Sequence, residues 1–425
     1  MGIGPLSTTP LPPGTIVHHA DTRLLFVTRM TRMFAYGFLS VILALYLAGL
    51  GLSGDRIGLL FSFILLGDVA VSLVITLVAD RIGRRRMLMM GSALMAGAGV
   101  VFAFTSDYTL LLIAGTIGVI APSDKDIGPF LSIEQAALSQ LVPDSGRTRS
   151  FAWYNLAGSF ASATGSLVCG SFVGFLQSRQ SFPLDPYRMV VVFYSFCGLV
   201  LVVMFQFLSS SVEVTQSPAG RPHRSFTLHQ SRGVVMKLSS LFAIDAFAGG
   251  FIVQSMIAYW FHLKFGVAPA TLGGIFFGAN IFAGVSALSA ARLAARFGLV
   301  NTMVYTHVPS SILLILVPLM PNLTLAILML LLRFTISQMD VPTRQSYTMA
   351  VVSPEERSAA SGVTNVVRSV GASIAPALCG RMLASPTLMS VPFFIAGGMK
   401  IVYDFMLYKS FREVHPPEET KSRRV

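Results

Sequence analysis

The chain carries few charged residues for its length. Of its 425 residues, 12% are Asp, Glu, Lys or Arg, whereas 53% are hydrophobic, and the mean hydropathy is +0.70. An ordinary globular domain contains about 25% charged residues, because its surface must face water. This composition excludes a soluble globular protein and indicates one that lies in a membrane.

Residues that usually carry enzyme chemistry are also sparse. The chain has three cysteines and seven histidines, and none of them shows the spacing of a metal site. Nucleophile motifs and a glycine-rich phosphate loop are missing as well. We therefore expect no enzyme activity, no metal and no cofactor.

Acidic residues are outnumbered by basic ones, 19 against 31, which gives a net charge of +12. A basic surplus can indicate nucleic-acid binding. In membrane proteins it has a simpler cause, because the cytoplasmic connections collect Lys and Arg. We expect no nucleic-acid partner.

The sequence does contain twelve apolar stretches between Thr22 and Phe411. A helix needs roughly 20 apolar residues to cross the hydrocarbon core of a bilayer, where it satisfies its own backbone groups. We predict an all-α membrane protein with twelve transmembrane helices, at 24–50, 57–79, 87–105, 109–141, 150–177, 188–208, 238–262, 271–291, 302–320, 322–350, 358–384 and 388–409.

Lys and Arg of the connections gather on the side that holds both ends of the chain. The positive-inside rule then places both termini in the cytoplasm. The longest polar connection lies in the middle of the chain and separates six helices from six. We predict a cytoplasmic tail at 1–21, a first bundle at 22–208, a central cytoplasmic loop at 209–236, a second bundle at 237–411 and a cytoplasmic tail at 412–425.

The two halves show a weak internal repeat. A shift of 210 positions brings Arg147, Asn155, Ser159, Cys169 and Gly170 onto Arg357, Asn365, Ser369, Cys379 and Gly380. Chance matches between apolar segments are the alternative, because few residue types fill such helices. A true repeat would relate the halves by an axis along the membrane normal, with a substrate site between them near the midplane.

The connection after the second predicted helix carries a charged motif, Asp80-Arg81-Ile82-Gly83-Arg84-Arg85-Arg86. It resembles the signature loop of the major facilitator superfamily, Gly-x-Leu-Ala-Asp-Arg-x-Gly-Arg-Lys, although Thr76 replaces the first glycine and Val78 the leucine. The resemblance implies two pseudo-symmetric six-helix bundles. It also implies a conformational latch at Asp80, Arg81, Gly83 and Arg84, because a carboxylate at a helix end can pair with Arg and with a neighbouring helix N-terminus.

Ionisable residues inside the predicted helices are costly, at roughly 2.5–3.5 kcal/mol each, and usually mark a pathway. Most lie in the first, fourth, seventh and tenth helices, the set that the resemblance implies to line a cavity. We expect substrate binding or ion coupling from Arg29, Arg32, Asp68, Asp126, Glu134, Asp245, Arg333, Asp340 and Arg344.

Some of these residues have other interpretations. Arg29 and Arg32 can instead extend to the membrane surface. Arg333 lies near the middle of its span, where we expect it to pair with a carboxylate or to bind an anionic group. Lys400 and Asp404 stand four positions apart, and we expect a structural pair on one helix face.

The fourth predicted helix contains a run, Ala121 to Phe130, with two prolines, a glycine and three charges. Such a run cannot form a regular helix facing lipid, and a broken helix is tolerated where it lines a cavity. The alternative is an external loop, which would leave Thr109 to Ile120 too short to span the bilayer.

These features together predict a secondary transporter. We expect it to move a small polar or charged solute by alternating access between the two bundles, coupled to protons, as a monomer in a lipid bilayer. The alternative is a membrane sensor or binding protein that has the same fold and does not transport.

Overall fold

The computed structural model describes residues 19–123, 128–142, 144–179, 184–213, 231–353 and 355–412. The described parts are helical and contain no strand. Many large apolar side chains lie on the outside, among them Phe104, Phe207 and Phe405, which are 80%, 73% and 65% exposed. Such a surface suits contact with lipid tails, because water would not tolerate so much exposed apolar area.

The first half of the chain forms eight helices: α1 (His19–Ser40), α2 (Leu43–Gly49), α3 (Gly54–Ile82), α4 (Arg84–Phe104), α5 (Tyr108–Ile117), α6 (Phe130–Leu141), α7 (Asp144–Gln177) and α8 (Asp185–Gln206). A 3-10 turn, η1 (Ser210–Val212), follows them. The second half forms α9 (Arg232–Gly250), α10 (Gln254–Phe265), α11 (Pro269–Phe297), α12 (Leu299–Leu316), η2 (Val317–Leu319), α13 (Leu323–Phe334), α14 (Asp340–Val351), α15 (Arg357–Leu383) and α16 (Val391–Phe411).

The two halves repeat the same order of elements. In each half the first and fourth expected spans are split into two helices, α1 with α2 and α5 with α6, then α9 with α10 and α13 with α14. The other spans are single long helices. This order is that of two related six-helix bundles.

Eight spans in the described residues are long and apolar enough to cross a membrane, or nine when α1 and α2, bent by 44°, count as one. The expected spans that fall short are α5 with α6, α13 with α14, and α15, which carry more polar residues or shorter apolar runs. The described helices are consistent with the predicted twelve crossings.

The break in the fourth span lies inside the protein. Residues 118 to 123 between α5 and α6 are buried, the Tyr194 hydroxyl donates to the Val119 carbonyl at 2.9 Å, and Ser255 N–H donates to the Pro122 carbonyl at 3.1 Å. This finding favours the broken helix over the external loop. The spans expected at 24–50, 238–262 and 322–350 each consist of two helices as well.

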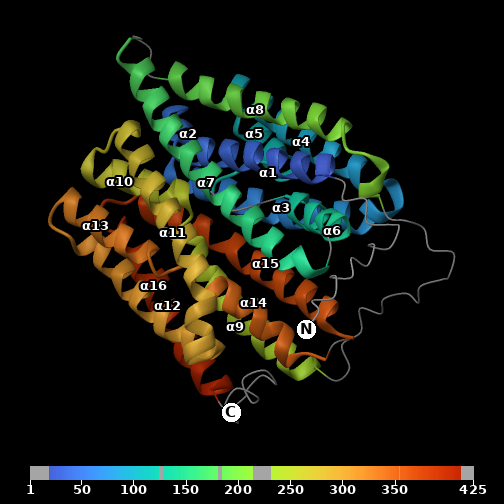
Figure 1. Cartoon of the computed structure of the whole chain (residues 1–425). Coiled ribbons are helices and arrows are strands. Elements are labelled where there is room, and N and C mark those ends of the chain that lie inside the picture. Colours follow the sequence, from blue (N-terminus) through green and yellow to red (C-terminus); the bar gives the residue numbers. More distant parts are fainter. Residues whose placement is uncertain are drawn as a thin grey trace, which may run out of the picture.

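We call the end of the molecule where α1 begins and α16 ends the terminal end, and the opposite end, where α2 and α10 finish, the distal end. In Figure 1 the first half, blue to green, lies above the second half, yellow to red, and α2 and α10 meet on the left. Two further helix crossings join the halves, α3 with α15 and α7 with α11.

Glycines allow these crossings to be very close. A Cβ on Gly380 of α15 would lie 2.2 Å from the Gly54 carbonyl oxygen of α3, and a Cβ on Gly273 of α11 would lie 2.6 Å from the Ser166 carbonyl oxygen of α7. Small residues at such positions let helix backbones pack directly in a membrane. The contacts at Gly54, Gly380 and Gly273 lie toward the distal end.

Candidate functional site

In the first half, a buried ion pair joins the first and fourth spans. Arg32 on α1 donates to both carboxylate oxygens of Glu134 on α6, each at 2.7 Å, and both side chains have no exposed surface. The Tyr154 hydroxyl of α7 donates to the same carboxylate, and the Phe130 ring lies 4.5 Å from the Arg32 guanidinium. A two-pronged pair with an added donor is the geometry that makes a buried charge tolerable.

Arg29 lies one turn earlier on α1 and also points inward. Its Nε donates to the Tyr154 carbonyl at 3.0 Å, and its guanidinium lies 4.4 Å from the centre of the Tyr154 ring. Arg29 and Arg32 are 5% and 0% exposed. The alternative in which these arginines extend to the membrane surface is therefore wrong.

Asp68 on α3 holds the break of the fourth span. Its carboxylate accepts the Gly128 N–H at 2.5 Å and the Ser72 hydroxyl at 3.3 Å. Gly128 has a φ of +84°, a backbone conformation that suits glycine. Asp126, the neighbouring candidate, lies outside the described residues.

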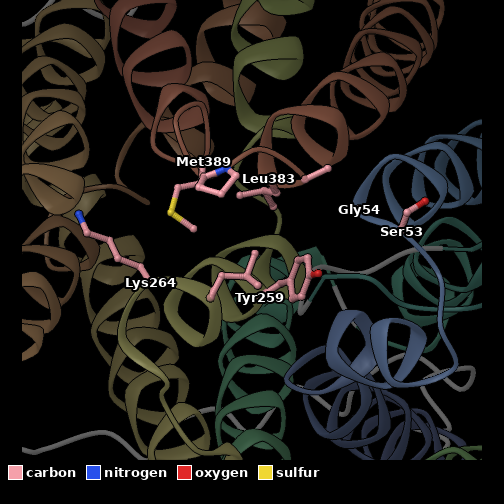
Figure 2. A pocket seen from close by; sticks show the side chains of 9 residues that line it. Ser53, Gly54, Tyr259, Lys264, Leu383 and Met389 are labelled. Atoms are coloured by element: carbon pink, nitrogen blue, oxygen red, sulfur yellow. The ribbon is translucent and has the colours of Figure 1, made fainter.

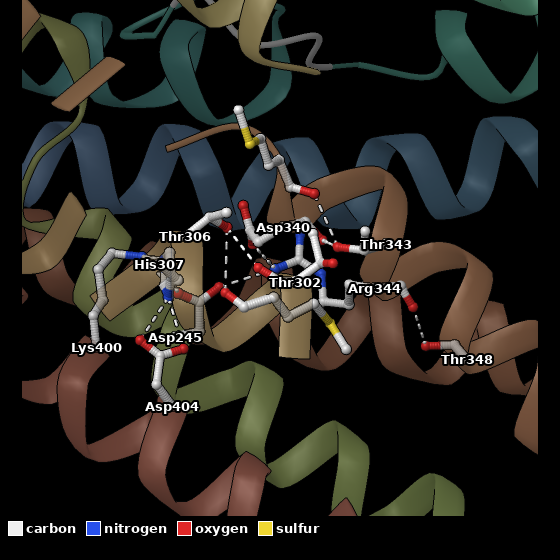
Figure 3. A network of polar contacts seen from close by, with 12 residues as sticks. Asp245, Thr302, Thr306, His307, Asp340, Thr343, Arg344, Thr348, Lys400 and Asp404 are labelled. Atoms are coloured by element: carbon white, nitrogen blue, oxygen red, sulfur yellow. Dashed lines mark hydrogen bonds and ion pairs between the residues drawn. The ribbon is translucent and has the colours of Figure 1, made fainter. Parts of the chain in front are cut away.

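In the second half, four helices contribute to a larger cluster of buried charges, shown in Figure 3. Asp245 on α9 accepts from Arg344 of α14 at 3.2 Å and from Lys400 of α16 at 2.5 Å. Arg344 also donates to Asp340, one turn earlier on α14, at 2.9 Å. The sequence candidates Asp245, Asp340 and Arg344 thus belong to one network.

Three members of this cluster, His307, Lys400 and Asp404, were not among our candidates for the site. His307 on α12 has its Nδ1 at 3.0 Å from both carboxylate oxygens of Asp404, and its Nε2 at 3.4 Å from Lys400 Nζ. Prediction of a Lys400–Asp404 pair on one face of α16 was wrong, since Lys400 pairs with Asp245 and Asp404 with His307. His307 could have been found from the sequence, because it is an ionisable residue inside the apolar stretch 302–320.

The contacts of His307 suggest its proton arrangement. An ammonium at Lys400 can only donate, so Nε2 accepts from it while Nδ1–H donates to Asp404. Lys400 and Asp404 then lie on opposite sides of one imidazole ring. Within the described ranges, no three His, Cys, Asp or Glu side chains are placed to hold a metal ion.

The two clusters are related by the internal repeat with their charges exchanged. Glu134 and Arg344 stand 210 positions apart, at matching places in α6 and α14. Glu134 pairs with an arginine of the first span, whereas Arg344 pairs with an aspartate of the seventh. In both halves a buried ion pair connects the two broken helices.

Arg333, near the end of α13, takes part in neither ion pair. It is 7% exposed, and its Nε has no hydrogen-bond partner among the residues that the structure describes. The Phe334 ring lies 5.1 Å from its guanidinium. Pairing with a carboxylate was one of two expectations for Arg333, and no such pair is present in the described residues.

The signature loop contacts the segment that follows α8. The Glu213 carboxylate accepts the Arg84 N–H at 2.6 Å and the Arg85 N–H at 3.2 Å, and so caps the first turn of α4. The Arg84 side chain donates to Gln140 at 3.0 Å, and Gly83 has a φ of +114°. These contacts lie within the first half. The Asp80 side chain is outside the described part, and Arg81 is exposed.

A cavity of 550 Å³ lies between the halves at the distal end. Figure 2 shows Ser53 just before α3, Gly54 of α3, Tyr259 and Lys264 of α10, and Leu383 of α15 around it. None of the candidate residues for the site lines this cavity. The charged clusters therefore belong to the interior of each half, away from this opening.

Comparison with known proteins decides the family. The family model described as Major Facilitator Superfamily matches residues 25–376 and, a second time, 240–424. The chain belongs to the major facilitator superfamily. This member is 31% identical over 417 residues to the uncharacterized membrane protein YJR124C of Saccharomyces cerevisiae, across 91% of this chain and 93% of that protein.

Solved structures share the superfamily fold at low sequence identity. The nucleoside transporter NupG is 15% identical with a TM-score of 0.70, over 92% of this chain and 99% of that one. A D-xylose–proton symporter is 14% identical with a TM-score of 0.71, over 92% and 98%. The human organic anion transporter MFSD10 is 15% identical with a TM-score of 0.60, over 94% and 100%. This chain is an integral, multi-pass membrane protein with a transporter fold.

Proposed function

We propose that this chain is a secondary transporter that carries a small polar or charged solute by alternating access, coupled to protons. The observation that carries this proposal is that each half holds its own buried ion pair between its two broken helices. A half whose ion pairs are internal can move as a rigid body, because no ion pair is broken by the movement.

The contacts between the halves are of a kind that such a movement can break. At the distal side, Gln254 of α10 donates to the Ser40 hydroxyl at 2.8 Å, and the Ser255 hydroxyl donates to the Ser40 carbonyl at 2.7 Å. Neutral hydrogen bonds contribute only about 0.5–1.5 kcal/mol each. With both termini in the cytoplasm, the distal end faces outward, and these bonds keep the outer gate closed.

Proton coupling is placed at His307 in this proposal. An imidazole can both donate and accept a proton, and this ring is faced by Asp404 and Lys400 of α16, by Asp245 of α9 and by the Tyr403 ring. A second proton on Nε2 would repel Lys400 and weaken its contact with the ring. Protonation of His307 would thereby change the ion pair between Lys400 and Asp245. Asp245 also binds Arg344 of α14.

The alternating movement can be tested without knowing the substrate. Ser255→Cys places a thiol at the outer gate, in a chain whose Cys169, Cys197 and Cys379, all buried, are replaced by alanine. The matched control is Ser195→Cys, because Ser195 also donates to a carbonyl at 2.7 Å but lies between α8 and α4 of one half. The measurement is the rate of labelling by a membrane-impermeant maleimide added from the distal side.

We expect steady labelling of the Ser255→Cys thiol and none of the Ser195→Cys thiol. Equal rates at the two positions would contradict the movement of the halves. For the proton, His307→Gln in liposomes should abolish substrate-dependent proton flux while the distal labelling of the Ser255→Cys thiol continues. A protein that binds its ligand but is never labelled at the gate would be the non-transporting sensor.

A further inference from the structure

The second half contains a buried guanidinium whose side chain has no ion-pair or hydrogen-bond partner among the described residues. Four acids are buried in the described second half, and each has a closer partner than Arg333: Asp245 contacts Lys400 and Arg344, Asp340 contacts Arg344, Asp404 contacts His307, and Glu356 accepts the Ser231 N–H. Arg333 is buried as deeply as these residues, yet no ion pair or hydrogen bond of its side chain is found in the described residues. A guanidinium stays protonated in proteins, so it cannot lose its charge to avoid burial.

A buried guanidinium whose N–H donors lack acceptors is unfavourable, although Asp340 and Asp245 lie near enough to favour its charge. The guanidinium offers a rigid fork of N–H donors, and that shape matches the two oxygens of a carboxylate or a phosphate. An anion is therefore the ligand that this side chain fits best.

The surroundings of Arg333 provide further donors. Ser337 lies one turn later, with its N–H bonded to the Arg333 carbonyl at 3.0 Å, and its buried hydroxyl has no partner among the described residues. The chain then begins α14, whose first turn has no side-chain cap. A half-helix N-terminus at a broken span favours negative charge. Asp340 stands in that turn, but Arg344 already holds its carboxylate.

We propose that the second half binds the carboxylate or phosphate group of a soluble anionic solute through Arg333 and Ser337, at the break between α13 and α14. This assignment of the substrate class rests on the proposed transport function. The first half offers no equivalent, because both Arg29 and Arg32 are already bonded. The anion is therefore held by one half only.

The test compares two buried arginines by thermal unfolding of the full chain in detergent. Arg333→Met removes the unpaired charge, whereas Arg32→Met removes the partner of Glu134 and serves as the control. Each protein is measured with and without inorganic phosphate or succinate, at constant ionic strength set with NaCl. A fourth sample adds phosphatidic acid or phosphatidylcholine in place of the soluble anion.

We expect phosphate or succinate to raise the Tm of the unmodified protein by roughly 2 °C or more, since a ligand that binds only the folded state stabilises it. Arg333→Met should start with a higher Tm than the unmodified protein and should show no response to either anion. Arg32→Met should start lower and keep the response. If Arg32→Met does not fold, Arg32→Met/Glu134→Leu takes its place.

Three results would overturn the proposal: no response of the unmodified protein to either anion, a lower Tm for Arg333→Met, or a retained anion response in that variant. A response to phosphatidic acid alone would replace the solute by a lipid headgroup. The labelling of the Ser255→Cys thiol tests the movement of the halves independently of anion binding. An anion response without labelling would leave the anion site standing and remove the transport function.

Discussion

At the scale of single residues, the charges inside this protein differ in how many partners they have. Glu134 binds one arginine and one tyrosine, whereas Asp245 forms ion pairs with two cations, Lys400 and Arg344. Removing an acid that pairs with two buried cations leaves more charge without a partner than removing an acid that pairs with one. Asp245 is therefore the central residue of the second cluster.

We predict that Asp245→Asn destabilises the protein by about 3–5 kcal/mol, because Lys400 loses its ion partner in the interior. Asp340→Asn should destabilise it less, since Arg344 keeps Asp245 at 3.2 Å. The measurement is the free energy of unfolding in detergent by chemical denaturation. Equal losses for the two variants would mean that Asp245 is not the shared partner.

Residue patterns in the sequence predicted which charges are buried but not which of them meet. The spacing of Lys400 and Asp404 fits a pair along one helix. Each instead contacts a residue of another helix, Lys400 with Asp245 and Asp404 with His307. Tertiary packing decides such choices, and a single sequence does not contain the distances between helices. For Arg333, the expectation of a carboxylate pair is not met in the described residues, and binding of an anionic group stays a prediction.

At the scale of elements, one of the four helix breaks was predictable. The fourth span has Pro122, Gly128 and Pro129 around its break, and proline removes a backbone donor from a helix. The breaks at residues 41–42, 251–253 and 335–339 contain neither residue. They are set by packing, for example by the contact of Ser255 with Ser40 across the two halves.

The close crossings of helices depend on individual glycines, and neighbouring positions on α11 provide a matched pair. A Cβ on Gly273 would lie 2.6 Å from a backbone oxygen of α7, whereas a Cβ on Gly274 would meet nothing within 4 Å. We predict that Gly273→Ala separates α7 from α11, lowers the Tm and speeds labelling of the Ser255→Cys thiol. Gly274→Ala should leave the Tm unchanged or raise it, because alanine favours a helix by about 1 kcal/mol. A loss of equal size in both variants would contradict this role of the crossing.

At the scale of the whole molecule, hydropathy and the signature motif were sufficient to predict the superfamily fold. Each apolar stretch must satisfy its own backbone in lipid, so the hydropathy pattern predicts the order of the helices, while the count of twelve crossings stays a prediction. The boundaries of the two bundles and of the central loop stay predictions, since residues 214–230 lie outside the described part. The single-chain, monomeric state also stays a prediction.

Orientation in the membrane can be tested directly. The terminal end holds Arg84, Arg85 and Arg86 together with the start of α1 and the end of α16, and basic residues mark the cytoplasmic side. We predict that an epitope tag after Val425 binds its antibody only after the cells are permeabilised. Binding to intact cells would invert the molecule, and the distal cavity would then face the cytoplasm.

The exchange of charge between the repeats has a consequence for the order of synthesis. Arg32 and Glu134 both lie in the first third of the chain and need no side chain from the second half. Domains generally fold as units, the earlier one first, while the ribosome is still adding residues. The first bundle can therefore form its central ion pair as soon as its own helices are inserted, before any helix of the second bundle has been made.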